Sequence, residues 1–270
     1  MKKLAFVSIL SFLIIISVQA FSHAFQNYNE PAFQAGEKIT YKLFYNWNFV
    51  WLSAGEVIFE VKDEGEEYHV EVTGYTYASY EWFYKVRDKY HTYINKKTLL
   101  PRLYIRDINQ GSYKHYEKIV FDQAAGKANS YTGKTISNLT KKEIYFSSPM
   151  YDLVSVMYLM RNIDRNQLKV HRTVPFSMML DHEIYNLALN YVKDEKKYSV
   201  KEMGKFNVLN CNASAISGHV FKEGAKMSLF IGDDHNNLPV LIESPLSVGS
   251  VKAVLKSQQK LKFPLDSKIK

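Results

Sequence analysis

Apolar and polar residues alternate with a period of two along almost the whole chain after residue 36. In the first such stretch Ile39, Tyr41 and Leu43 fall on one side, with Thr40 and Lys42 on the other. Because successive side chains of a strand point to opposite faces, this pattern predicts strands. Long antiparallel strands must bury one face, and ten or more of them curl. We therefore expect an all-β, mostly antiparallel protein, a strongly curved sheet or barrel-like β domain with one short helix.

Turn residues divide the alternating stretches into individual strands. The polar segment 62–67, which contains Gly65, separates two alternating runs and predicts a hairpin. The compact aromatic segment 79–86 predicts one helical turn or an aromatic corner. Further strands are expected at 87–94, from Leu103, at 113–121 and 127–132, and about six more from Phe176, with turns at 194–197, 223–224, 233–237 and Pro245.

Residues 151–161 form the one segment that predicts a helix. Asp152 can cap it, because its carboxylate can accept hydrogen bonds from the free N–H groups of the first turn. Arg161 stands at the other end, where a cation complements the helix dipole. One apolar stripe is expected, formed by Leu153, Val156, Met157 and Met160.

The first 24 residues are typical of a secretory signal peptide. Lys2 and Lys3 precede a short apolar run, and small residues follow around Ala20 and Ala24. We expect cleavage, a single domain over 25–270, and a periplasmic or secreted location; an uncleaved anchor is the alternative. The only cysteine is Cys211, so the leader has no lipobox and no intramolecular disulfide is expected.

Composition points to the class of partner. Without Lys2 and Lys3, 33 basic residues face 27 acidic ones, a net charge of +6, which favours anionic partners such as a membrane surface. Nucleic acid is not expected for an exported chain without a recognised binding motif. Twenty Tyr, sixteen Phe and three Trp suit a pleated sheet, and they also suit a ligand cavity or stacking platform.

Motifs that carry catalysis are missing from the sequence, which has no nucleophile elbow, zinc-protease motif or phosphate-binding glycine loop. The cluster 181–183 (Asp-His-Glu) would on a strand put its histidine opposite the two carboxylates. Segment 232–237 lacks the spacing of a calcium loop and suits a turn. Cys211 is expected to be a buried small hydrophobe. We therefore assign no catalytic residue, metal or cofactor, and consider an enzyme less favoured than a binding protein.

Large aromatic residues suggest where a ligand could bind. Trp47, Phe49 and Trp51 alternate, which on one strand would place three large rings on one face. They could form core or a binding surface. Arg161 could likewise face an anionic ligand, or tether the helix through a buried carboxylate. The expected cavity lining is Tyr41, Tyr45, Trp47, Trp51, Trp82 and Arg161.

Several short motifs occur in an order that resembles an uncharacterised bacterial envelope family, domain of unknown function 3108. They are G-E-K-I-T-Y at 36–41 with A-G-E at 54–56, T-L-L-P at 98–101, the helix pattern D-x-x-S-x-x-Y-x-x-R at 152–161, and Asp234 followed by L-P-V at 238–240 and V-G-S-V at 248–251. The resemblance implies an exported, mostly antiparallel β protein. It supplies no activity and no catalytic residues.

Three functions remain open on the sequence. The first is a periplasmic binding protein that holds an apolar or amphiphilic ligand, a lipid or lipid-linked glycan, in a β cradle. The second is a polysaccharide-binding or carbohydrate-active envelope protein with an exposed tryptophan as its platform. The third is a structural or assembly partner in the envelope. The expected partner is a hydrophobic or anionic small molecule or a glycan, with the membrane surface as a further candidate.

Overall fold

The computed structural model describes residues 30–47, 50–147, 149–214, 226–246 and 249–269. They form one sheet of sixteen strands and two short helices. The strands are β1 (Lys38–Trp47), β2 (Val50–Glu64), β3 (Glu67–Thr76), β4 (Arg87–Asn95), β5 (Pro101–Gln110), β6 (Tyr113–Asp122), β7 (Lys127–Gly133), β8 (Leu139–Tyr145), β9 (Met150–Tyr151), β10 (Thr173–Leu180), β11 (Glu183–Val200), β12 (Gly204–Ser214), β13 (Lys226–Gly232), β14 (Pro239–Pro245), β15 (Ser250–Gln259) and β16 (Lys268–Ile269), and the helices are α2 (Ser155–Arg161) and α3 (Arg165–His171).

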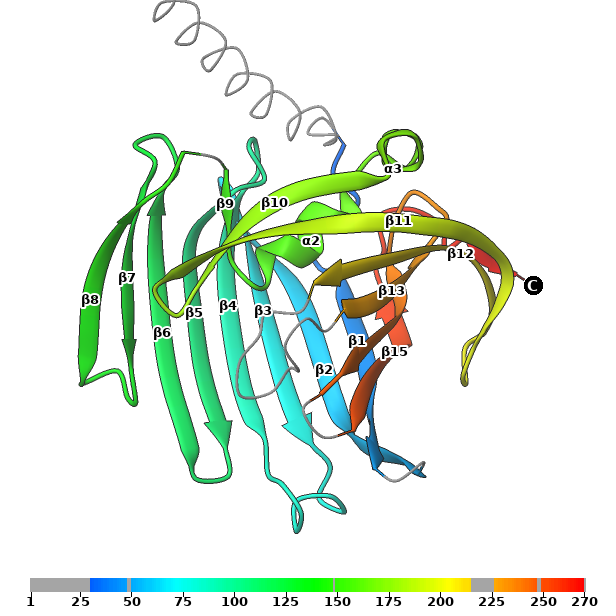
Figure 1. Ribbon diagram of the computed structural model, residues 1–270, viewed down its shortest axis with the longest axis horizontal. Helices are drawn as coiled ribbons and strands as arrows, with labels where there is room; N and C mark the ends of the chain where they lie inside the picture. The colour runs from blue at the N-terminus through cyan, green and yellow to red at the C-terminus, as the bar shows by residue number, and fades with distance from the viewer. Residues whose placement is uncertain (1–29, 48–49, 148, 215–225, 247–248, 270) are drawn as a thin grey trace, which may run out of the picture.

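Antiparallel hairpins build both halves of this sheet. Strands β1 to β8 pair in sequence order, and β10 to β15 do the same. Strand β1 pairs with β2 on one side and with β15 on the other, so the first and last long strands join the halves. Among the described strands, β8 and β9 stand at the two ends of the order, and the only parallel pairing is that of β9 with β10. The expected all-β, antiparallel fold is confirmed as an open, strongly curved sheet (Figure 1).

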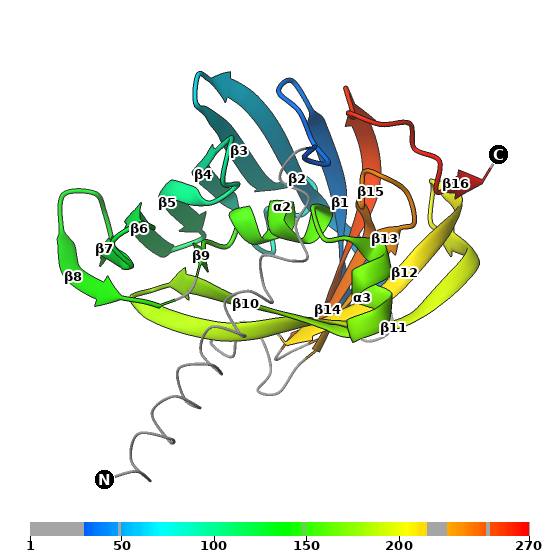
Figure 2. The same ribbon diagram turned by 90° about the horizontal axis from the view of Figure 1, so that it is seen from above.

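Helix α2 lies inside the curve of the sheet (Figure 2). Asp152 precedes it and accepts hydrogen bonds from the backbone N–H groups of Val154 and Ser155, at 2.8 and 2.9 Å. Its other carboxylate oxygen accepts one from the Thr92 hydroxyl of β4, which ties the helix start to the sheet. The carboxylate of Asp152 therefore accepts hydrogen bonds at the helix start as expected, although the residue in the N-cap position is Val154. The helix itself begins at Ser155, later than the predicted residue 151.

The expected single apolar stripe is wrong. Leu153 is exposed, whereas residues on nearly every side of α2 are buried. The reason is its position, because a helix surrounded by a curved sheet contacts protein all round. The ring of Tyr158 packs on that of Phe33, with centroids 4.6 Å apart, while Leu159 joins a cluster from the second half of the sheet. This packing fills the concave side with core.

Most predicted strands and turns are confirmed, including the hairpin at Gly65 and the turn after β13. The turn expected at 194–197 is wrong, because β11 runs through it as one long strand with a register shift between Glu195 and Tyr198. Strand β8 and helix α3 were not predicted. The turn expected at 223–224 lies outside the described residues. No helix in the described ranges is long and apolar enough to cross a membrane.

Candidate binding site

Two of the six predicted lining residues belong to the core. Arg161 is fully buried at the end of α2, and its guanidinium forms a double ion pair with the buried Glu37 carboxylate, at 2.5 and 2.9 Å. It also donates to the backbone oxygens of Ala32 and Asn236. Tyr41 is 2% exposed and donates to the Pro239 carbonyl at 2.8 Å. Neither side chain lines the pocket described below, and the contacts of Arg161 are those of the tether that the sequence offered as its alternative role.

The predicted row of three aromatics on one strand is also wrong. Strand β1 ends at Trp47 and β2 begins at Val50, and these two residues pair with each other. Trp47 and Trp51 therefore belong to different strands. The side chain of Trp47, and the whole of Phe49, lie outside the described residues.

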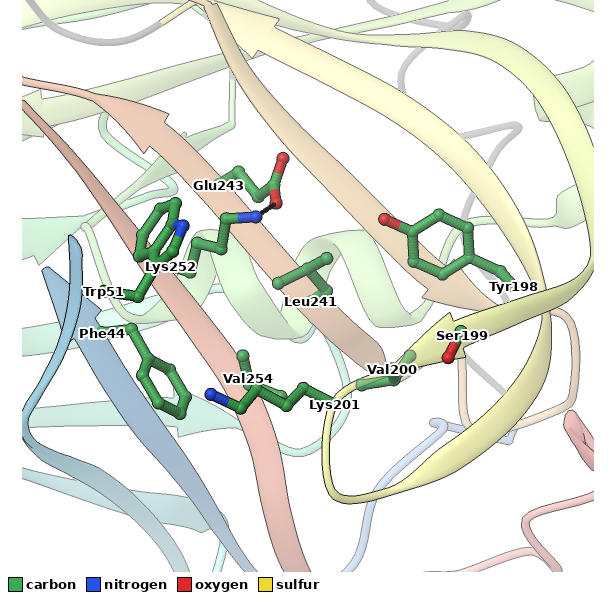
Figure 3. Close-up of a pocket in the computed structure, with 10 residues that line it drawn as sticks. All are labelled: Phe44, Trp51, Tyr198, Ser199, Val200, Lys201, Leu241, Glu243, Lys252 and Val254. Carbon is green, nitrogen blue, oxygen red and sulfur yellow. Dashed lines mark ion pairs between the residues drawn. The ribbon is translucent and has the colours of Figure 1, made fainter. Parts of the chain in front are cut away.

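Trp51 lines a pocket of about 180 Å³ on the face of the sheet turned away from α2. In Figure 3 the lining side chains stand in front of β14 and β15, and α2 lies behind these strands. Strand alternation explains the arrangement, since Leu241 and Glu243 share one face of β14, and Lys252 and Val254 share one face of β15. The end of β11 and the turn residue after it cover the other side with Tyr198, Ser199, Val200 and Lys201.

The pocket combines an apolar floor with a charged rim. Phe44, Leu241 and Val254 are buried and form the floor. At the rim, Lys252 pairs with Glu243 at 2.5 Å and places its ammonium group 4.5 Å from the Trp51 ring. Lys201 places its own ammonium 4.6 Å from the Phe44 ring. Two lysines and one glutamate leave the rim with a net positive charge.

Tyr45 and Trp82 lie at the end of the sheet where β1 meets β2, and Tyr45, which follows Phe44 in β1, faces away from the pocket. The Tyr45 ring stacks on Phe83, with centroids 6.5 Å apart, and Phe83 in turn contacts Trp82. Trp82 is 83% exposed and lies on the connection between β3 and β4, whose turn hydrogen bonds fit the helical turn that the sequence offered as one of two alternatives, the other being an aromatic corner. The predicted aromatic set is thus divided between the core, the pocket and this end.

A second group of polar side chains lies where the β10–β11 turn meets the first half of the sheet. Asp181 and His182 form that turn, both with positive φ (50° and 64°), and Glu183 begins β11, so the strand geometry considered for 181–183 applies to Glu183 alone. Arg106 is shared between the carboxylates of Asp181 and the fully buried Glu117. Burial raises the pKa of Glu117 to about 7. Against the effect of burial, the hydrogen bond from His115 and the charge of Arg106 lower the pKa of Asp181 to about 2.

This polar group is poorly suited to a metal or to nucleophilic catalysis. Ligand atoms of His115, Glu117 and Asp181 lie within 4.8 Å of one another, but the Arg106 guanidinium already supplies the positive charge there. His182 Nδ1 lies 2.9 Å from the Ser130 hydroxyl, a serine–histidine contact that the sequence analysis missed. Ser130 is completely buried, and the other nitrogen of His182 contacts the Thr132 hydroxyl instead of a carboxylate. A substrate therefore has no access to the serine in this arrangement.

Comparisons with known proteins agree with the fold. The family described as "Protein of unknown function (DUF3108)" matches residues 40–256. The crystal structure of a β-barrel-like protein of domain of unknown function DUF1849 from Brucella abortus is similar, with a TM-score of 0.56 and 8% identity. The similarity covers 83% of this chain and 97% of that one, and at this identity it concerns the fold alone. No curated protein matches the chain.

Proposed function

This chain belongs to the DUF3108 family, and we propose that it is an exported, non-enzymatic binding protein for amphiphilic ligands with an anionic head. The observation that carries the proposal is the pocket lined by Trp51, whose floor is apolar and whose rim carries Lys201 and Lys252. An apolar floor favours a hydrocarbon group, and ammonium groups at the rim favour an anion beside it. The leader-like residues 1–24 support export to the periplasm or beyond.

The size of the pocket limits what enters it. Sites that enclose a whole drug-sized ligand usually measure about 300–1,000 Å³. At about 180 Å³ this pocket suits one end of an amphiphile or a single ring, with the rest of the molecule outside. This site differs from the cradle expected from the sequence, because α2 and its core neighbours occupy the concave side of the sheet.

A titration with octanoate tests the proposal. We expect saturable binding by calorimetry, and at least about tenfold weaker binding after Lys201→Gln with Lys252→Gln, because both rim charges are lost. Leu241→Asn should weaken the binding of octanoate and of uncharged octyl glucoside alike. Lys141→Gln, at an exposed lysine of the edge strand β8, is the control. No binding of octanoate, or equal binding by the rim variant, would refute the proposal.

A glycan ligand is the second candidate, and the exposure of Trp51 (37%) and Trp82 (83%) favours it. Sugar rings stack on the faces of exposed aromatic side chains. Lys252 already lies over the Trp51 ring, which leaves Trp82 as the more available platform. Two results together would favour this function over the first. The protein would bind neutral oligosaccharides, with the binding abolished by Trp82→Ala, and it would not bind octanoate.

A further inference from the structure

The end of the sheet where β1 meets β2 carries a cluster of exposed aromatic side chains, which we define as the aromatic tip. Trp82, Phe83 and Tyr84 are 83%, 46% and 43% exposed on the β3–β4 connection, and Tyr113 at the start of β6 is 54% exposed. Figure 1 shows the β3–β4 connection and the β5–β6 turn at the same end of the sheet, together with the ends of β1 and β2.

Contacts between these segments make the tip continuous. The Tyr84 hydroxyl contacts the Gln110 side chain at 3.5 Å, and the backbone N–H of Gly111 donates to the Lys85 carbonyl at 2.8 Å. Tyr45 of β1 stacks on Phe83. This contact joins the tip to β1, the strand that pairs with the Trp51 region of β2. A contiguous apolar surface of this kind, exposed to solvent, marks an interaction site.

Local hydrogen bonds hold the tip in shape. The N–H of Tyr80 donates to the Tyr77 carbonyl at 2.8 Å, and the N–H of Phe83 donates to the Tyr80 carbonyl at 2.9 Å. Arg87 pairs with Glu81 across the same turn, and the N–H of Val86 donates to the Thr76 hydroxyl. Because these rings are already positioned, docking them does not require the ordering of a loose segment.

Charge and residue type together select the partner. Lys85, Arg87 and Lys114 are exposed around the tip. In segments 77–87 and 110–115, Glu81 is the only residue with a carboxylate side chain. Trp and Tyr have an apolar body and a polar edge, and they prefer the boundary between lipid headgroups and acyl chains. Cations beside such rings are attracted to anionic lipid headgroups. A protein partner would need complementary shape, whereas a bilayer requires only this combination.

We propose that the aromatic tip docks the protein on the surface of an anionic membrane, with the rings of Trp82 and Phe83 entering the interface. This inference goes beyond the proposed function, since membrane docking does not require that the pocket binds a ligand. If both hold, Trp51 connects them, because it lines the pocket and follows β1 at the same end of the sheet as the tip.

Flotation with lipid vesicles tests the docking. The purified protein should bind vesicles of phosphatidylethanolamine with phosphatidylglycerol, and bind vesicles of phosphatidylcholine alone more weakly. Trp82→Ser with Phe83→Ser should lower the affinity about tenfold or more, because both rings leave the interface. Lys85→Gln with Lys114→Gln should weaken binding to the anionic vesicles alone and reduce its dependence on salt.

The matched control is Val170→Ser with Val192→Ser, which removes two exposed apolar side chains (72% and 39%) outside the tip. This variant should bind vesicles as the wild type does. The inference is wrong if the wild type binds no vesicle, if the control loses as much affinity as the tip variant, or if the tip variant binds unchanged. Capture of a protein partner through the tip without vesicle binding would also overturn it. Octanoate titration of the tip variant separates the two proposals, because the pocket residues are intact.

Discussion

The guanidinium of Arg161 lies 2.5 Å from the Glu37 carboxylate, and both side chains are completely buried between helix α2 and the segment before β1. The Phe33 and Tyr158 rings flank the guanidinium, with centroids 5.9 and 5.7 Å away. On the other side, the Asn237 amide donates to the carbonyl oxygens of Arg161 and Ile163. The ion pair therefore joins the segment before β1 to the helix, and hydrogen bonds of Asn236 and Asn237 tie the β13–β14 connection to the same helix end.

Removing one partner of this pair should be costly. Arg161→Met leaves the Glu37 carboxylate buried without its counter-charge, and we expect a loss of about 3–5 kcal/mol in the free energy of unfolding. Urea denaturation followed by circular dichroism measures it. The double variant Arg161→Met with Glu37→Gln should recover part of the loss, because no charge is then buried.

The surface pair Lys38–Glu60 is a matched control, since its side chains are 39% and 38% exposed. Lys38→Met should cost no more than about 1 kcal/mol. A similar cost for Lys38→Met and Arg161→Met would contradict the role that we assign to the buried pair.

Stability should depend on pH through Glu117. Burial raises its pKa from an ordinary value of 4.5 to about 7, so the folded state binds the proton more tightly than the unfolded chain. The contribution of Glu117 to the free energy of unfolding therefore becomes less favourable as the pH rises from 4.5 to 7. Glu117→Gln removes this effect, and we expect the variant to gain stability relative to the wild type across that window. Urea denaturation at several pH values measures the difference.

Glu71 provides a control of opposite sign. The hydrogen bond from Lys62 at 2.5 Å lowers the pKa of Glu71, so its stabilising contribution is present above its ordinary value of 4.5 and is lost as the pH falls. Glu71→Gln should therefore be less stable than the wild type at and above pH 4.5, and this difference should shrink as the pH falls below 4.5. If both variants show the same sign, the assignment of Glu117 is wrong.

Local sequence patterns were sufficient to predict the hairpins and most strand positions. Alternation and turn residues act over a few neighbours, so β2, β3 and the turn at Gly65 could be predicted. The long β11 could not, because the polar run through Lys197 is typical of a turn, and only pairing with β12 keeps the strand intact. Trp51 was predicted as a lining residue, but its pocket also needs Leu241, which lies far away in sequence. The pairing of β1 with β15 brings such residues together, and no local pattern predicts this pairing.

Cys211 should be chemically inert in the folded protein. It is completely buried in β12, and burial raises the pKa of its thiol to about 12. Because the thiolate is the reactive form, we expect no reaction with a thiol reagent such as dithionitrobenzoate under native conditions. In urea, one thiol per chain should react, at a rate that follows unfolding. Rapid modification without urea would show that this part of β12 opens readily.

Two glycines on paired strands should respond very differently to alanine. At Gly55 of β2 a Cβ atom would lie 2.0 Å from the Tyr75 carbonyl oxygen and 2.8 Å from the Thr76 Cα. These are backbone atoms, so the β2–β3 pairing would have to shift, and we expect Gly55→Ala to cost about 1–3 kcal/mol or more. At Gly74 of β3 the nearest atoms are side-chain carbons at 3.8 Å, an ordinary contact, and alanine should be neutral or slightly stabilising. Thermal unfolding of both variants checks this, and equal melting temperatures would mean that the close approach at Gly55 does not constrain the fold.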